Sequence, residues 1–242
     1  MADKPEFVWV IERNRLFCKG YTPYGFFQKH DCFGTDFLAV LDNAFFMERS
    51  YAETHSQYKQ IIPYTIVSNT NGAACTLEEV TYPTFIYQRT PKGDEERLHH
   101  KFSIGIGGHI SPEDMNPTHD PLWTFVNGAS REVHEELTVL IDGDKDNYQS
   151  MPDQLCCPIG FINDDTTEVG SVHLGVVCSL LVDDACINEK DQLVGEFVFP
   201  HQLKSFPHTA VTSKTHFGYE PGEYESWSQF LVDKNEETRW LT

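Results

Sequence analysis

Apolar and polar residues alternate in short runs along most of this chain, a pattern that predicts β-strands on both sides of one long helix. Residues 37–46 are also apolar, but they fit a strand and a short helix equally well. Strands before and after a central helix predict one α/β or α+β domain with a mixed sheet. The predicted strands are residues 7–11, 16–18, 60–68, 84–88, 102–110, 158–162, 172–182 and 195–199, and a closing helix is predicted over residues 223–232.

The long helix is predicted over residues 122–137. Asp120 is a favourable N-cap, and Pro121 suits the first helical position because its missing N–H would have no partner there. At about 100° per residue, the apolar side chains of the segment fall within an arc of about 80°. They are Leu122, Val126, Ala129, Val133 and Leu137. The helix is therefore amphipathic and buries one face.

Three acidic residues, Glu132, Glu135 and Glu136, share an arc of about 100° beside the apolar stripe of this helix. Like charges at such spacing cost a few tenths of a kcal/mol each in an exposed helix. A hard divalent cation with oxygen ligands would relieve the repulsion. A solvated acidic face is the alternative interpretation, because charge runs usually face water.

The segment before the helix favours the metal site over the solvated acidic face. Residues 104–110 read Ile-Gly-Ile-Gly-Gly-His-Ile, so a strand leads into glycines where backbone can approach a ligand closely. A carbonyl of Gly107 or Gly108 could add one oxygen to the carboxylates. Mg²⁺ needs few protein ligands when phosphate oxygens and water complete its octahedron.

The overall charge limits which partners this chain can bind. Among its 242 residues, 18 Lys and Arg stand against 37 Asp and Glu, a formal net charge of −19. Such an excess of acids argues against sequence-independent binding to nucleic-acid phosphates. It also repels an anionic substrate unless local cations or a metal ion neutralise the acids.

Location and redox state also follow from composition. No apolar run approaches the roughly 20 residues that span a bilayer, and the first residues lack the basic and then apolar pattern of a secretory signal. We therefore expect a cytoplasmic protein with no membrane partner, and the sequence is compatible with a homodimer. The seven cysteines show no CxxC pair or zinc spacing, which favours several reduced, buried thiols.

The glycine segment and the acidic helix together resemble the Nudix hydrolase family. The family's box runs glycine, five residues, glutamate, seven residues, Arg-Glu, an apolar residue, any residue, Glu-Glu, any residue, glycine and an apolar residue. Here residues 131–137, Arg-Glu-Val-His-Glu-Glu-Leu, match its core, and residues 107–110 are similar to its opening. The resemblance implies an α/β/α sandwich with a mixed sheet over residues 59–242, carrying an N-terminal elaboration over residues 1–58.

The resemblance also implies roles for individual residues. Glu132, Glu135 and Glu136 would hold Mg²⁺ or Mn²⁺ with a carbonyl of Gly107 or Gly108. Glu132 would be a third ligand or the group that orients or deprotonates water, and Arg131 would hold a glutamate in place. The implied reaction is metal-assisted attack of water on a small-molecule diphosphate, such as a nucleoside diphosphate derivative, with Glu136, Glu132 and Arg131 as the catalytic residues.

Three basic residues, Arg89, Arg97 and Lys101, are candidates to bind substrate phosphate, although a solvated loop is the alternative for the run over residues 97–101. Residues 163–168 are predicted to form a turn, and the acidic side chains in it could supply a further metal ligand. His173, in an apolar run, is interpreted as a satisfied core histidine.

Two features depart from the family pattern. The gap between Gly108 and Arg131 holds 22 residues, and Trp123 stands eight residues before Arg131, where the first glutamate would fall. Glu113 or Asp114 could substitute for that glutamate. Thr138 replaces the glycine after Glu-Glu, which leaves the end of the helix without its usual turn residue.

Two other functions remain open at this point. A Nudix-like sensor would bind a nucleotide without turnover, although such modules commonly lose the acids that are intact here. A diphosphate isomerase on the same fold would require a cysteine and a glutamate that face each other across a pocket.

Overall fold

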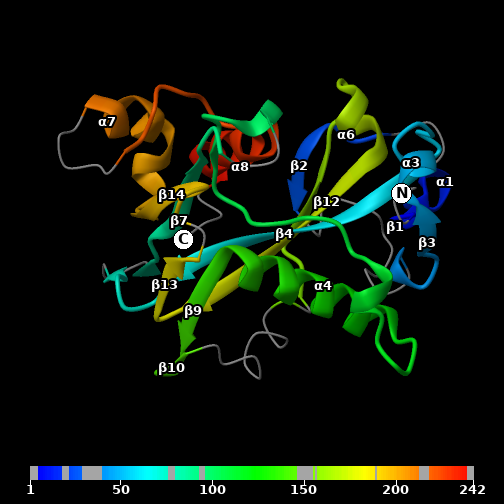
Figure 1. The fold of residues 1–242 in the computed structure, drawn as a ribbon. Coiled ribbons are helices and arrows are strands. Elements are labelled where there is room, and N and C mark those ends of the chain that lie inside the picture. Colours follow the sequence, from blue (N-terminus) through cyan, green and yellow to red (C-terminus); the bar gives the residue numbers. More distant parts are fainter. Residues whose placement is uncertain are drawn as a thin grey trace. The chain divides into compact units, whose positions relative to one another are not determined.

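The computed structural model describes residues 5–17, 22–28, 40–75, 80–92, 96–145, 155, 157–188, 190–212 and 218–238. The chain forms two compact units. The first consists of Met1–Thr65, Gly107–Val133 and Met151–Ser179, and the second of Ile66–Ile106, His134–Ser150 and Leu180–Thr242. Three elements supply residues to both units: β4 (Tyr58–Asn69), β12 (His173–Val182) and α4 (Pro121–Glu136) (Figure 1).

The first unit is built from antiparallel strand pairs around an apolar core. Besides its parts of β4 and β12, its strands are β1 (Phe7–Glu12), β2 (Gly25–Gln28), β3 (Phe45–Glu48) and β11 (Gly160–Asn163). Strand β1 pairs with β3 and β4, and β11 lies between β2 and β12. Phe161 is opposite Phe27 in this register, and their rings stack with centroids 5.9 Å apart. The short helices are α1 (Arg13–Leu16), α3 (Arg49–Ala52), α6 (Glu168–Val172) and the 3₁₀ turn η2 (Pro112–Asp114).

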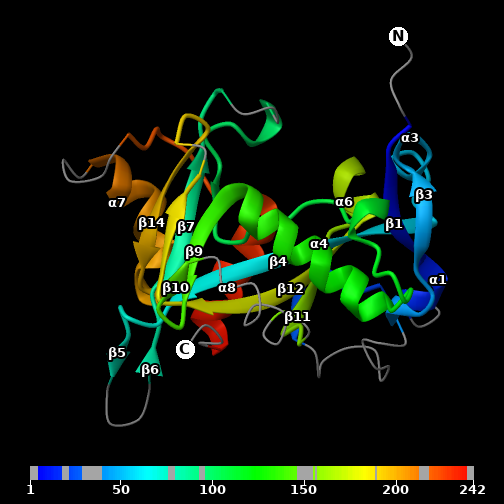
Figure 2. The ribbon, with the colours of Figure 1, turned by 60° about the horizontal axis from the view of Figure 1, so that its bottom comes forward.

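The second unit has β7 (Thr84–Arg89) as its central strand, paired with β14 (Leu193–Val198), β8 (Phe102–Ser103) and the end of β4. A second small sheet has the order β10 (Asp144–Lys145), β9 (Leu137–Ile141) and β13 (Asp184–Ile187). The hairpin of β5 (Ala74–Cys75) and β6 (Val80–Thr81) is a separate pair (Figure 2). The remaining helices are η1 (Glu96–Leu98), η3 (Pro200–Ser205), α7 (Phe206–Thr212) and α8 (Ser226–Thr238).

Most of the predicted elements are confirmed, including the long helix as α4 and the closing helix as α8. The predicted class, an α/β protein with a mixed sheet, is confirmed as well. The division at residue 58 into an elaboration and a main domain stays a prediction. None of the helices in the described ranges is long and apolar enough to cross a membrane.

Two strand predictions are corrected by the structure. Residues 16 and 17 are not in a strand, because Phe17 N donates to Arg13 O at 3.2 Å and closes a helical turn that buries Leu16, and residue 18 of the predicted strand lies outside the described residues. The strand expected over residues 102–110 ends at Ser103. Beyond it, the N–H of Ile104 donates to the Ser228 hydroxyl at 2.9 Å instead of to a neighbouring strand.

The cysteine and surface predictions have mixed outcomes. The sequence favours several buried thiols, but among the described cysteines Cys178 is buried and Cys75, Cys157 and Cys186 are exposed. The cysteines at positions 18, 32 and 156 lie outside the described residues.

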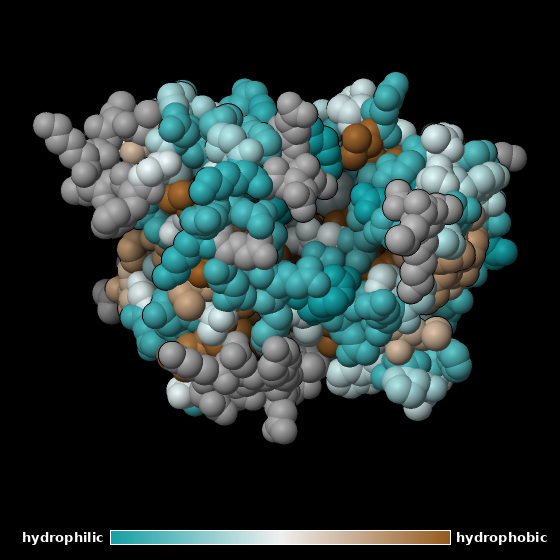
Figure 3. Space-filling model, viewed as in Figure 1, coloured by the Kyte–Doolittle hydropathy of each residue, from teal (hydrophilic) through white to brown (hydrophobic). Residues whose placement is uncertain are grey.

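Figure 3 shows one face covered mostly by hydrophilic side chains with small hydrophobic areas, in keeping with the strongly acidic composition.

Candidate active site

Helix α4 begins where the sequence predicts. The Asp120 carboxylate accepts from the N–H groups of Leu122 at 2.9 Å and Trp123 at 3.3 Å, which satisfies two donors of the first turn. Val126, Ala129 and Val133 lie on the buried face. The acids Glu132, Glu135 and Glu136 therefore follow at defined positions beside this buried face, in the last turns of the helix.

Arg131 is held by Asp114 across the inserted loop. Arg131 Nε donates to Asp114 Oδ1 and Nη2 donates to Oδ2, both at 2.9 Å. The Asp114 side chain is only 4% exposed, so the guanidinium is the cation that compensates a buried carboxylate. Arg131 also donates to Glu132 Oε1 and to the carbonyl of His109, each at 2.8 Å.

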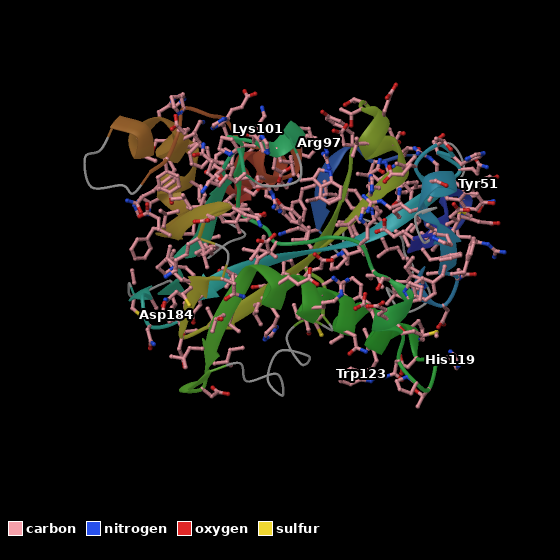
Figure 4. The ribbon with its side chains drawn as sticks, viewed as in Figure 1. Tyr51, Arg97, Lys101, His119, Trp123 and Asp184 are labelled. Carbon is pink, nitrogen blue, oxygen red and sulfur yellow. The ribbon has the colours of Figure 1, made fainter. Side chains whose placement is uncertain are left out.

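Of the two acids that the sequence offered in place of the family's first glutamate, Glu113 and Asp114, this pair shows that Asp114 contacts Arg131. Counted forward from Gly108, five residues lead to Asp114, whereas counting back from Arg131 leads to Trp123. Trp123 is 41% exposed on the surface of α4 (Figure 4). The extra residues therefore lie after the acid, between Asp114 and the helix, and Asp114 is fixed by η2 and by the Ser111 N–H, which donates to Oδ2 at 2.8 Å.

The two glycines permit close approaches that a side chain would prevent. A Cβ atom at Gly108 would lie 2.5 Å from Cδ of Glu132, so the glutamate carboxylate packs directly on the Gly108 backbone. A Cβ atom at Gly107 would overlap the carbonyl oxygen of Pro63. A methyl group at Gly107 would clash with backbone, and one at Gly108 would displace the Glu132 carboxylate, so the two glycines allow this carboxylate to lie against the backbone.

The other two acids of α4 belong to the second unit. Glu135 is exposed, and Glu136 is half-buried with its Oε1 accepting from Arg89 Nη2 at 3.3 Å. The Arg89 guanidinium lies 5.7 Å from the centre of the Tyr87 ring. Burial raises the pKa of Tyr87 to about 12, so its hydroxyl stays protonated and donates to the Gly105 carbonyl at 3.0 Å.

The end of α4 has a cap that the sequence pattern did not predict. The helix ends at Glu136, and Asn188 donates from its backbone N–H to Glu136 O at 2.9 Å and from Nδ2 to His134 O at 2.7 Å. Thr138, which replaces the family glycine, donates its hydroxyl to Asn188 Oδ1 at 2.6 Å. The asparagine amide thus satisfies helix carbonyls that a glycine turn would otherwise satisfy.

The predicted phosphate-binding residues have different surroundings. Arg97 is exposed on η1, and Lys101 forms an ion pair with Glu223 (Figure 4). Arg89 pairs with Glu136 rather than facing solvent alone. Their role in binding phosphate stays a prediction.

The predicted site residues thus fall into two groups. In the first unit the structure brings together Gly107, Gly108, Arg131 and Glu132, with Asp114 added. In the second it joins Glu136 to Arg89, with Glu135 on the same helical turn.

A further cluster was missed in the sequence. His173 is buried as predicted, but its Nε2 atom lies 3.2 Å from Nε2 of His109, and Glu53 is close to both. These three residues are 56 and 64 positions apart, so no local spacing could have indicated them. The only available signal was the position of His109 directly after the two glycines.

Comparison with known proteins shows the fold. No protein-family model matches the chain. Protein YmaB from Bacillus subtilis (strain 168) is 27% identical over 237 residues, which cover 96% of this chain and 98% of that protein. The crystal structure of Tm1382, a proposed Nudix hydrolase, superposes with a TM-score of 0.63 at 23% identity, covering 95% of this chain and 97% of Tm1382. The chain therefore has the fold of a Nudix hydrolase, as its sequence predicts.

Proposed function

We propose that this chain, which has the Nudix fold, is a divalent-metal-dependent hydrolase that cleaves a phosphoanhydride by attack of water. The observation that carries this proposal is the arrangement around Glu132. Its carboxylate packs on the Gly108 backbone and accepts from Arg131, which is itself held by the buried Asp114. A preorganised carboxylate of this kind suits a metal ligand or a group that orients water.

The donor set on α4 fits Mg²⁺ or Mn²⁺. Glu132, Glu135 and Glu136 are hard carboxylate ligands spaced over five residues of the helix, and the proposed further ligand is a carbonyl of Gly107 or Gly108. When bound, such an ion neutralises phosphate charge and lowers the pKa of its water. It would also relieve the mutual repulsion of the three acids.

The protein's own residues have separable roles in this proposal. Glu132 holds a proton-accepting oxygen in a fixed position, because both Arg131 and the Gly108 backbone restrict its side chain. Arg131 is a positioning residue whose guanidinium joins helix α4 to the loop at Asp114 and to the carbonyl of His109. Glu136 shares the charge of Arg89, so Arg89 can exchange this carboxylate for a substrate phosphate.

The proposed substrate is a small-molecule diphosphate, such as a nucleoside diphosphate linked to another group. Arg97 and Lys101 would add the positive charge that an anionic substrate requires in a chain of net charge −19. We further propose that the protein acts in the cytoplasm and needs neither nucleic acid nor membrane. A homodimer is compatible with this role.

A substrate panel tests the proposal. The full chain is incubated with Mg²⁺ or Mn²⁺ and with nucleoside diphosphate derivatives and other phosphoanhydrides, and release of phosphate or nucleotide is measured. We expect turnover by the wild type and a loss of about 100-fold or more in Glu136→Gln, since a metal ligand is removed. Glu113→Gln, which changes an exposed acid of η2, is the matched control and should keep its activity. Nucleotide binding without turnover would instead identify a sensor.

A further inference from the structure

Three side chains outside the acids of α4 converge in the first unit. Glu53 directly follows α3, His109 directly follows Gly108, and His173 is the first residue of β12. One ligand atom from each lies within 4.8 Å of the other two. His173 is buried, and the other two are half-buried.

We propose that Glu53, His109 and His173 bind a borderline transition-metal ion, with Zn²⁺ as the expected occupant. This site goes beyond the proposed hydrolase function, because none of its side chains belongs to the acidic set of α4. The proposal rests on the geometry of the two imidazoles, on the way each is held, and on the chemistry of the donor set.

The distance between the histidines fits a shared ion. Their Nε2 atoms are 3.2 Å apart. Two nitrogen ligands bound at about 2.0–2.1 Å to one tetrahedral Zn²⁺ are separated by about 3.3 Å. Both nitrogens could therefore reach one ion with little movement of the rings. The Glu53 side chain is 35% exposed, and one of its carboxylate oxygens lies within 4.8 Å of a ring nitrogen of each histidine.

The protonation of His173 favours binding through Nε2. Its Nδ1 lies 2.7 Å from the Val169 carbonyl, which can only accept, so Nδ1 carries a proton. In the neutral ring the lone pair is then on Nε2, which faces His109. A histidine whose second nitrogen donates to a backbone carbonyl is the usual arrangement of a metal ligand, because this bond fixes both tautomer and orientation.

The backbone at both histidines is held firmly. Lys59, which is fully buried, donates from Nζ to the carbonyls of Gly170 at 2.8 Å and His173 at 3.2 Å, and to Asp165 Oδ1 at 2.7 Å. The His109 carbonyl accepts from Arg131 at 2.8 Å. Arg49 contacts Oε1 of Glu53 at 3.2 Å, which places the carboxylate and still leaves it a second oxygen. Each of the three donor residues is thus held by a different partner: His173 by Lys59, His109 by Arg131 and Glu53 by Arg49.

The donor chemistry separates this site from the acids of α4. Two imidazole nitrogens and one carboxylate suit Zn²⁺, Co²⁺ or Ni²⁺, whereas Mg²⁺ prefers oxygen ligands alone. Three protein ligands also leave at least one position of a tetrahedral ion open to water or another ligand.

Metal titration of the full chain tests the proposal. The protein is first treated with a chelator, and Zn²⁺ affinity is then measured by competition with a chromophoric chelator. Co²⁺ is added in a parallel experiment, where its visible absorption bands report the ligand geometry. We expect one Zn²⁺ per chain at this site, bound more tightly than Mg²⁺, and a Co²⁺ spectrum of a nitrogen- and oxygen-ligated ion.

Three ligand variants and one control make the test specific. His109→Asn, His173→Asn and Glu53→Gln should each weaken Zn²⁺ binding about tenfold or more and abolish the Co²⁺ bands. Asparagine at position 173 keeps an amide N–H for the Val169 carbonyl, and circular dichroism verifies folding. His119→Asn is the matched control, since His119 is exposed and its positive φ of 59° also suits asparagine.

The outcomes distinguish this site from the proposed hydrolase. Unchanged Zn²⁺ affinity in folded His109→Asn and Glu53→Gln would overturn the proposal and leave a hydrogen bond between two histidines. Weakened affinity in these variants, with wild-type affinity in Glu136→Gln, would support a site independent of the α4 acids. The zinc titration needs no substrate, so it keeps its meaning even if no phosphoanhydride is turned over.

Discussion

Arg131 and Asp114 are joined by two parallel hydrogen bonds of 2.9 Å, although 17 positions separate them in the sequence. The pair connects the glycine segment's loop to the helix that carries the acids. Because the remaining N–H groups of Arg131 donate to Glu132 and to the His109 carbonyl, one guanidinium fixes groups of both candidate sites. Its loss should therefore affect stability and activity together.

Asp114→Asn should destabilise the protein by about 2 kcal/mol, since it removes the charge that faces a partly buried guanidinium. Chemical denaturation measures the change, with Glu113→Gln as the exposed neighbouring control. In a double-mutant cycle with Arg131→Gln, the two costs should not add, because both variants break the same pair. Additive costs would show that Arg131 and Asp114 act independently.

Alanine at the two glycines should separate stability from activity. In Gly107→Ala the new methyl meets the Pro63 carbonyl, which is backbone and cannot rotate away, so we expect a cost of about 2–4 kcal/mol. In Gly108→Ala it meets the end of the Glu132 side chain, which can be pushed away from its place beside Arg131 at little cost to the fold. The free energy of unfolding should then change by less than about 1 kcal/mol. The rate of hydrolysis should fall about 100-fold because Glu132 is displaced. Equal losses of unfolding free energy in the two variants would contradict this distinction.

Asn188→Ala should destabilise the end of α4 by about 1 kcal/mol, because the carbonyl of His134 loses its side-chain donor. Thr138→Val should cost less, since it only releases the orientation of Asn188. Thermal unfolding and amide hydrogen exchange in the last turn of the helix measure both. No change in exchange near His134 would rule out the asparagine as a cap.

The ion pairs of Asp165 predict a pH dependence in acid. Burial by itself raises the pKa of Asp165, but hydrogen bonds from Arg13 and Lys59 outweigh it and lower the value to about 2, from 3.8. The stability from Asp165 is therefore present above its unfolded pKa and is lost as pH falls through the folded value. Burial lowers the pKa of Lys59 to about 8, so Lys59 stays charged throughout this range.

Comparison with Asp165→Asn isolates this contribution. The difference in unfolding free energy between wild type and variant should shrink by about 2 kcal/mol between pH 5 and pH 2. Urea denaturation at several pH values measures the difference. A difference that stays constant over this range would mean that Asp165 does not titrate as its partners imply.

Metal binding at the α4 acids should be visible as stabilisation. Addition of Mg²⁺ or Mn²⁺ at about 100 times its Kd should raise the free energy of unfolding by about 2.7 kcal/mol in the wild type. Glu135→Gln should remove most of this increment, whereas the exposed Glu113→Gln should keep it. An identical increase in melting temperature for wild type and Glu135→Gln would place the ion elsewhere in the protein.

The sequence by itself determined helix α4 and the common side of its acids, whereas the contacts of Gly107 with Pro63 and of Gly108 with Glu132 came from the structure. The helix and its acids are local features: a rotation of about 100° per residue fixes which side chains share a helix face. It also determined the Nudix fold, through the spacing of the acidic core.

Only the tertiary structure decided that Asp114 rather than Trp123 meets Arg131, that Asn188 caps α4, and that Glu53 and His173 converge on His109. Each of these contacts joins segments whose distance depends on how strands pair and how long the intervening loop is. No periodicity within one segment encodes that distance, because side-chain contacts across a sheet are set by strand order and register.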